Sequence, residues 1–160
     1  MTGSDREAAR ASSIRGGAMA VRLFGFPKPL VAACTGHAFT IGTIRLAGCD
    51  TRIGEEGPFK FGMRETALGM VLPDWAVLPL KERLSQAYFL AAVTQSQTFD
   101  PLGASEAGFL DRLVPGGQVV EDACALAKKL SQLPAHAYAG NKLSRRGDVL
   151  ERMRARLSAR

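Results

Sequence analysis

Few side chains in this sequence suit covalent or acid–base chemistry. Glu65 is the most suggestive carboxylate, because it follows a Phe-Gly pair and precedes an apolar stretch, which favours partial burial. A carboxylate held in such a place can move protons as a general acid or base. His37 lies in a glycine turn, where it could contact a ligand or simply cap the turn. From the residues alone, a solvated Glu65 and a structural His37 remain open alternatives.

Other kinds of catalytic site find little support. The chain has only two histidines, His37 and His136, and neither has a convincing nucleophile for a Ser/His/Asp arrangement. The three cysteines, Cys34, Cys49 and Cys124, form no Cys-x-x-Cys pair, which argues against a zinc site or a disulfide scaffold and suits a reducing cytoplasm. No glycine-rich nucleotide motif is present. The sequence therefore predicts no bound metal.

The positive charge is concentrated at one end of the chain. The net charge is +6, and residues 142–160 carry seven of the 21 basic residues but only two of the 15 acidic ones. A local basic helix without interleaved aromatic residues does not favour a nucleic-acid-binding domain. No apolar run is long enough to span a bilayer, and the first residues lack a signal-like apolar segment. We expect a cytoplasmic protein with no nucleic-acid or membrane partner.

Patterns of apolar residues, glycine and proline predict alternating strands and helices. Residues 1–12 are polar and look frayed. The predicted helices cover residues 14–26, 40–49, 74–83, 86–94, 101–107, 118–132 and 139–157. The predicted strands cover residues 30–34, 50–54, 59–62 and 109–114. A strand, a glycine turn, a helix and a second strand over residues 30–54 form a βαβ unit, which indicates α/β architecture.

Three segments together resemble the crotonase superfamily, the enoyl-CoA hydratase/isomerase family. They are K-P-L-V-A-A-C-T-G-H-A-F-T-I-G-T-I-R-L-A-G-C-D-T-R-I (28–53), F-K-F-G-M-R-E-T-A-L-G-M (59–70) and A-G-F-L-D-R-L-V-P (107–115). Each piece is weak alone, but their order and spacing are specific. The resemblance covers most of the chain from about residue 16 onward.

The resemblance implies an α/β fold with a crotonase-like ββα spiral core and a C-terminal helical region. The family's N-terminal strands, and an A-F-S-x-G-x-D loop that supplies one oxyanion amide, have no counterpart here. We therefore expect a truncated core that lacks roughly the family's first third. The corresponding division is a flexible N-terminus over 1–15, a partial core over 16–115 and a helical region over 116–160.

The resemblance also assigns chemistry to individual positions. The family's second oxyanion amide, usually glycine, falls on Ile41, and Gly42 beside it leaves room for a ligand. The first hydratase glutamate falls on Ile44 and the second on Glu65. A single carboxylate suffices to shuttle a proton between two carbons, as in the family's isomerases. His37 lies beside this site and could touch coenzyme A or a substrate carbonyl.

The implied protein is a lyase or isomerase that acts on an acyl-CoA thioester, with no cofactor beyond the coenzyme A of its substrate. The alternative is an inactive family member that binds acyl-CoA or assembles with relatives. The last helix carries an apolar stripe of Leu143, Leu150, Met153 and Leu157 opposite its basic residues. We expect that stripe to dock on a neighbouring subunit of a homo-oligomer, a trimer or hexamer, with the basic residues solvated or close to the phosphates of coenzyme A.

Overall fold

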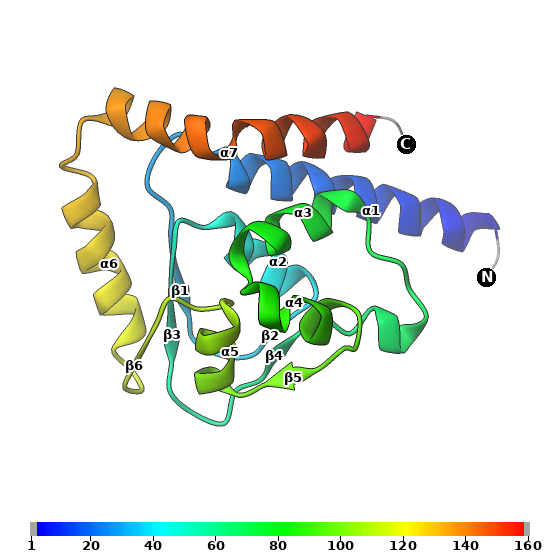
Figure 1. Ribbon diagram of the computed structural model, residues 1–160, viewed down its shortest axis with the longest axis horizontal. Helices are drawn as coiled ribbons and strands as arrows, with labels where there is room; N and C mark the ends of the chain where they lie inside the picture. The colour runs from blue at the N-terminus through cyan, green and yellow to red at the C-terminus, as the bar shows by residue number, and fades with distance from the viewer. Residues whose placement is uncertain (1–2, 159–160) are drawn as a thin grey trace.

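The computed structural model describes residues 3–158 and arranges helices around two small sheets (Figure 1). The helices are α1 (Gly3–Phe24), α2 (Ile41–Gly48), α3 (Asp74–Arg83), α4 (Gln86–Val93), α5 (Pro101–Ala107), α6 (Val119–Leu130) and α7 (Ala135–Ser158), with a 3₁₀ turn η1 (Thr66–Leu68). The strands are β1 (Val31–Cys34), β2 (Ala38–Phe39), β3 (Thr51–Glu55), β4 (Phe61–Gly62), β5 (Thr98–Phe99) and β6 (Arg112–Val114).

The larger sheet has the order β1-β3-β6 and is parallel throughout. Val31 pairs with Thr51 and Ile53 with Arg112, so the predicted βαβ unit of β1, α2 and β3 is confirmed. Strand residues with short apolar side chains suit a parallel sheet covered on its faces. Helix α6 packs on β1 and β3 through Val119 and Ala123.

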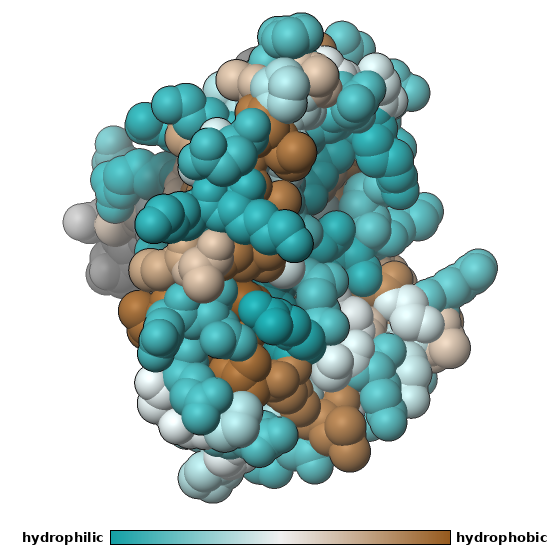
Figure 2. Space-filling view, turned by 90° about the vertical axis from the view of Figure 1, so that its left-hand side faces the viewer, coloured by the Kyte–Doolittle hydropathy of each residue, from teal (hydrophilic) through white to brown (hydrophobic). Residues whose placement is uncertain are grey.

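Helix α6 shows why one stripe of a surface helix must be apolar. Val119 and Ala123 are buried against the sheet, while Glu121 and Lys128 face solvent. Figure 2 views the molecule from this side, and hydrophilic residues cover most of the surface with hydrophobic residues visible between them. The first turns of α7 lie on the same side of the molecule as α6 (Figure 1).

The second sheet is built from three two-residue strands in the order β2-β4-β5. Strand β2 pairs in parallel with β4, and β4 pairs antiparallel with β5. Neither β2 nor β5 was predicted, and β2 lies in the segment predicted as a turn, because two residues are too few to show an alternating pattern. This sheet ties the residues before α2 to the segment that leads to Glu65.

The start of α1 differs most from the sequence prediction. Helix α1 begins at Gly3, so the part of residues 1–15 that the structure describes is helical, and the frayed end predicted there is wrong; residues 1 and 2 lie outside the described range. Ala, Glu and Arg between positions 6 and 11 are strong helix formers and extend the helix without an apolar pattern. The predicted ends of α5 are confirmed. The Asp100 side chain caps the helix by accepting a hydrogen bond from the Gly103 amide, and Gly108 ends it at φ 93°.

The prediction that α7 docks on a neighbouring subunit is wrong. Helix α7 lies along α1 and against α3 of its own chain (Figure 1). Leu150 and Met153 are buried in this chain's core and Leu157 packs against it, whereas Leu143 is exposed. The sequence could not show that α1 and α3 together supply the surface that covers the stripe.

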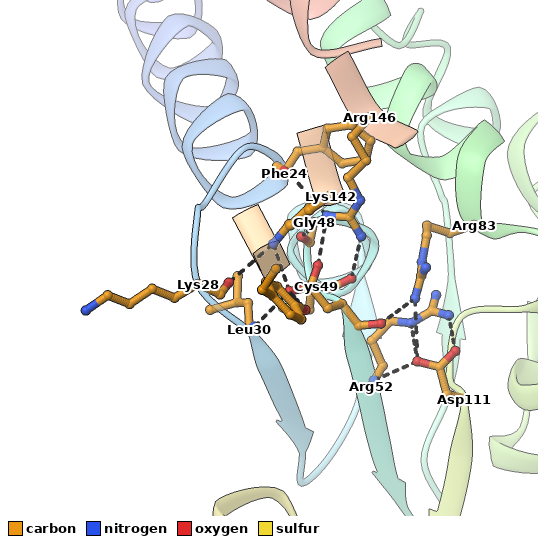
Figure 3. Close-up of polar contacts among 12 residues, drawn as sticks. Phe24, Lys28, Leu30, Gly48, Cys49, Arg52, Arg83, Asp111, Lys142 and Arg146 are labelled. Atoms are coloured by element: carbon orange, nitrogen blue, oxygen red, sulfur yellow. Dashed lines mark hydrogen bonds and ion pairs between the residues drawn. The ribbon is translucent and has the colours of Figure 1, made fainter. Parts of the chain in front are cut away.

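Arg146 of α7 is buried and the Lys142 side chain is only 9% exposed, which corrects the expectation that the basic residues all line the polar side of this helix. The Asp50 carboxylate accepts hydrogen bonds from Lys142 Nζ at 2.7 Å and from the Tyr138 hydroxyl at 2.9 Å. Arg146 lies 3.2 Å from the same carboxylate. It also donates to the carbonyl oxygens of Phe24, Gly48 and Cys49 at 3.1–3.2 Å (Figure 3).

These acceptors explain the position of Arg146. Phe24 and Gly48 are the last residues of α1 and α2, and the C-terminal carbonyls of a helix lack partners and carry partial negative charge. Burial lowers the pKa of the Arg146 guanidinium, although Asp50 opposes this. One cation on α7 therefore joins the ends of two helices that precede the parallel strands.

A second ion-pair cluster joins β3 to β6. Arg52 donates to Asp111 through Nε at 3.0 Å and Nη2 at 2.6 Å (Figure 3). Its Nη1 donates to the Gly108 carbonyl. Arg83 lies 3.5 Å from the same carboxylate. Burial alone would raise the pKa of Asp111, but the hydrogen bonds and charge of Arg52 outweigh it and lower that pKa. The cluster holds the strand end in register.

Candidate functional site

A cavity of about 590 Å³ lies between α1, the start of α2 and the loop that leads into α3. Its lining comprises Ala9, Ser12, Ser13, Arg15, Gly16, Met19, Thr40, Ile41, Ile44, Arg45, Glu65, Met70, Val71, Leu72, Pro73, Trp75 and Ala76. Two predicted site residues, Glu65 and Ile41, thus meet at one cavity. Glu65 is the only carboxylate among these lining residues.

Glu65 is buried although it carries a carboxylate. The residue is 4% exposed, and its Oε2 atom is enclosed without a hydrogen-bond partner. Buried polar atoms are normally satisfied, so an unsatisfied one calls for an explanation, of which a catalytic role is one. Since the neighbouring lining is largely apolar, this carboxylate is the candidate acid–base group of the cavity.

The 3₁₀ turn η1 positions Glu65. The Glu65 carbonyl accepts from the amides of Leu68 at 3.0 Å and Met70 at 2.8 Å. The turn is held to the end of α4, because the Ala67 amide donates to Ser96 Oγ at 3.1 Å. The Thr66 hydroxyl donates to the Val93 carbonyl at 3.2 Å. The backbone that carries the carboxylate is therefore fixed on both sides.

Thr40 turns the chain sharply before α2. Its φ of 51° and ψ of −111° lie in a region that residues with a side chain rarely adopt. The Thr40 amide donates to the Gly62 carbonyl at 3.2 Å, and the Thr40 carbonyl accepts from the Ile44 amide at 3.1 Å. Strained backbone of this kind clusters at functional sites. Among residues 3–158, Ser96, which anchors η1, is the only other non-glycine residue with positive φ.

The sharp turn at Thr40 leads directly into α2. Ile41, the first residue of α2, lines the cavity, whereas Gly42 is not among the lining residues. The first N–H groups of a helix have no acceptor within the helix and favour developing negative charge. A Cβ added to Gly42 would meet only the Ala38 Cβ at 3.5 Å, so Gly42 leaves room but is not sterically required.

His37 has partners of its own outside the cavity. Its Nδ1 accepts a hydrogen bond from the Lys60 amide at 3.0 Å, and its ring contacts those of Phe39 and Phe59. These contacts join the β1–β2 turn to the segment before β4. His37 is not among the cavity-lining residues, and its contact with a substrate stays a prediction.

Ile44 also lines the cavity and is almost fully buried. It stands where the resemblance expects a first glutamate, so this wall of the cavity is apolar. Thr43, next to it, donates its hydroxyl to the Thr40 carbonyl at 2.7 Å. The charged residues of the cavity lining are therefore Glu65, Arg15 and Arg45, and the first residue of α2 lies beside them in the lining.

Thiol and metal chemistry gain no support. Burial raises the pKa of the Cys49 thiol to about 11, with Asp50 adding to the effect, so the nucleophilic thiolate is scarce at neutral pH. Burial also raises the pKa of Cys34. Within residues 3–158, no group of three or more His, Cys, Asp and Glu side chains could hold a metal ion.

Sequence reasoning missed the side of the cavity that α1 contributes. Gly16 and Gly17 weaken a helix, but both pack against the Trp75 ring: a Cβ at Gly16 would lie 3.2 Å from Cη2, and one at Gly17 3.1 Å from Cδ1. Two adjacent glycines within a predicted helix were therefore the feature of the sequence that could have indicated a bulky side chain packed across α1. Trp75 is the single tryptophan of the chain, which makes its fluorescence a reporter for the cavity.

Over the described part of the chain, no helix is both long and apolar enough to cross a membrane.

Comparisons with known proteins agree on one family. A family model for enoyl-CoA hydratase/isomerase matches residues 3–156. The chain is 30% identical over 139 residues to a probable enoyl-CoA hydratase, EchA17, of Mycobacterium tuberculosis, which covers 87% of this chain and 52% of that protein.

The human mitochondrial enoyl-CoA delta isomerase 1 is 29% identical over 118 residues, or 73% of this chain and 39% of that protein. The chain thus spans about half the length of the curated relatives it matches. Among solved structures, an enoyl-CoA hydratase/isomerase family protein from Pseudomonas syringae superposes with a TM-score of 0.91 at 33% identity, over 96% of this chain and 66% of that one. An enoyl-CoA isomerase of Mycobacterium tuberculosis gives the same score and identity, over 96% and 68%.

Proposed function

The chain belongs to the enoyl-CoA hydratase/isomerase family, and on that premise we propose that its cavity binds an acyl-CoA thioester and that Glu65 acts there as acid and base. The observation that carries the proposal is the buried Glu65 carboxylate, unpartnered at Oε2, in the same cavity as the N-terminus of α2. The reaction best matched to one carboxylate is the movement of a double bond along the acyl chain.

In the proposed reaction, the Glu65 carboxylate removes a proton from C2 of a 3-enoyl-CoA. The electron pair shifts into the thioester, and the amides of Ile41 and Gly42 stabilise the charge on its oxygen. Glu65, now a carboxylic acid, returns the proton to C4, and a 2-enoyl-CoA results. The proton and the electrons balance without a metal, an oxidant or a second carboxylate, so coenzyme A is the only cofactor component proposed.

The alternative is an inactive member that binds acyl-CoA or assembles with relatives, and one observation argues against hydratase activity in particular. Ile44 is buried in the wall where hydration would need a second carboxylate. Two carboxylates normally divide the work of activating water and moving a proton to carbon. Net hydration of a 2-enoyl-CoA by this chain is therefore the less supported of the two family activities.

A Glu65→Gln variant tests the proposal, because it keeps the shape of the side chain and removes the base. The assay follows the absorbance of the conjugated thioester as 3-hexenoyl-CoA is converted to 2-hexenoyl-CoA. We expect the rate to fall by about 10²-fold or more. Glu151→Gln is the matched control, since Glu151 is exposed on α7 away from the cavity. Isomerase activity that survives Glu65→Gln within a few-fold would show that Glu65 is not the catalyst; an inactive wild-type chain that still binds acyl-CoA would favour the alternative.

The remaining parts of the proposal concern the setting of the reaction. We propose a homo-oligomer, a trimer or hexamer as is usual in the family, and a cytoplasmic location. Fewer basic residues of α7 are available to contact coenzyme A phosphates than the sequence implied. Arg145 pairs with Glu82, and Arg156 pairs with Asp74. Arg15 and Arg45, which line the cavity, are the better candidates for contact with an anionic ligand.

A further inference from the structure

The loop between η1 and α3 exposes a strip of large apolar side chains, defined here as Leu68, Met70 and Val71. All three are exposed, and Val71 reaches 95% of its full accessible surface. Single exposed apolar residues are ordinary on a protein surface, whereas several together beside a cavity mark a binding surface. The strip therefore needs an occupant.

This strip lies beside two cavities. Met70 and Val71 line the Glu65 cavity and also a second cavity of about 430 Å³, whose wall includes Phe89 and Val93 of α4. No charged residue lines the second cavity. The strip thus connects the cavity that holds the carboxylate with an uncharged cavity on the other side of the loop.

The charges around the first cavity indicate how an acyl-CoA would lie. Arg15 and Arg45 come from α1 and α2, whereas the strip belongs to the loop between η1 and α3. The phosphate-bearing end of the ligand is favoured on the arginine side, and the hydrocarbon end on the apolar side. This arrangement makes the acyl chain a better occupant of the strip than a protein partner.

We propose that the acyl chain runs from the Glu65 cavity over Met70 and Val71 into the second cavity, so that the protein prefers long acyl chains over short ones. This inference rests on the proposed function. Each methylene that is buried along the path should raise affinity about fourfold, until the second cavity is filled.

The test measures binding of butyryl-, octanoyl- and dodecanoyl-CoA, each below its micelle concentration, by Trp75 fluorescence and by calorimetry. Wild-type protein should bind dodecanoyl-CoA at least 100-fold more tightly than butyryl-CoA. Val71→Asp should lower the ratio of dodecanoyl-CoA to butyryl-CoA affinity at least tenfold. Because Val71 is almost fully exposed, its replacement should not disturb the fold. The matched control is Val120→Asp on α6, which also replaces an exposed valine but lies on no cavity described above.

Equal affinity across the series in wild-type protein would overturn the inference without any variant. A length dependence that Val71→Asp leaves unchanged would overturn it too. If that variant instead lowers the oligomer mass in light scattering while the length series is unchanged, a second copy of the chain covers the strip and the inference is wrong. Failure to bind any acyl-CoA would remove the proposed function as well, whereas a flat series together with loss of isomerase activity in Glu65→Gln would remove only the inference.

Discussion

Arg146→Met should destabilise the protein far more than the same change one residue earlier. Arg146 has a side chain only 10% exposed and is paired with Asp50 at 3.2 Å. It also donates to three main-chain carbonyls at the ends of α1 and α2, and its guanidinium lies 4.5 Å from the centre of the Phe24 ring. Methionine preserves helix propensity and much of the apolar packing, but it removes every donor.

The magnitude follows from what the substitution leaves behind. Removing one partner of a buried ion pair costs about 3–5 kcal/mol. Each buried carbonyl that is left without a donor would cost about 1–3 kcal/mol, although these terms overlap and Asp50 keeps Lys142 as a partner. We therefore expect a loss of about 4 kcal/mol, a large share of the 5–15 kcal/mol typical of a domain.

Urea denaturation followed by far-UV circular dichroism measures the effect. With a slope of about 2 kcal/mol per molar urea, the midpoint should fall by about 2 M. Arg145→Met is the control, because the Arg145 side chain is 71% exposed and its pair with Glu82 should contribute at most about 1 kcal/mol. Equal midpoints for the two variants would refute the view that Arg146 joins the helix ends.

Two further outcomes follow from the titrating groups. At pH 8, a thiol reagent should modify the exposed Cys124 rapidly. Cys34 and Cys49 should react only slowly, because burial raises the pKa of both thiols. A Cys124→Ser variant that keeps the fast phase of modification would contradict this. The pKa of Asp111 is lowered by Arg52 in the folded state, so its contribution to stability is present above the unfolded value of about 3.9 and is lost as pH falls through the lower folded value. The urea midpoint of wild type should therefore fall more steeply below pH 4 than that of Asp111→Asn, and parallel pH curves would count against the pairing.

The sequence by itself determined the order of the main elements. The apolar run that ends at Cys34 predicts a strand, because a short continuous apolar run is typical of a strand in a parallel sheet. The stretch after Asp50 has no such run, and its place after the helix predicts the second strand of a βαβ unit. Asp100 and Gly108 marked both ends of α5, because helix caps are local chemistry between neighbouring residues. The same local spacing carried the family resemblance and singled out Glu65.

Only the tertiary structure decided how these pieces meet. Glu65 shares its cavity with Gly16 and Met19 of α1, which are distant in sequence, and no local pattern shows an unpartnered carboxylate oxygen. The side of the cavity formed by α1 was hidden, because Gly16 and Gly17 are explained by side chains far away in sequence, the Trp75 ring at both glycines and Leu157 at Gly17. Likewise, Lys142 and Arg146 have the sequence character of a solvated helix face, yet they are buried because Asp50 and the ends of α1 and α2 lie opposite them. Spacing along a chain fixes which residues share a helix face, but the partner of that face is set by contacts between elements far apart in sequence.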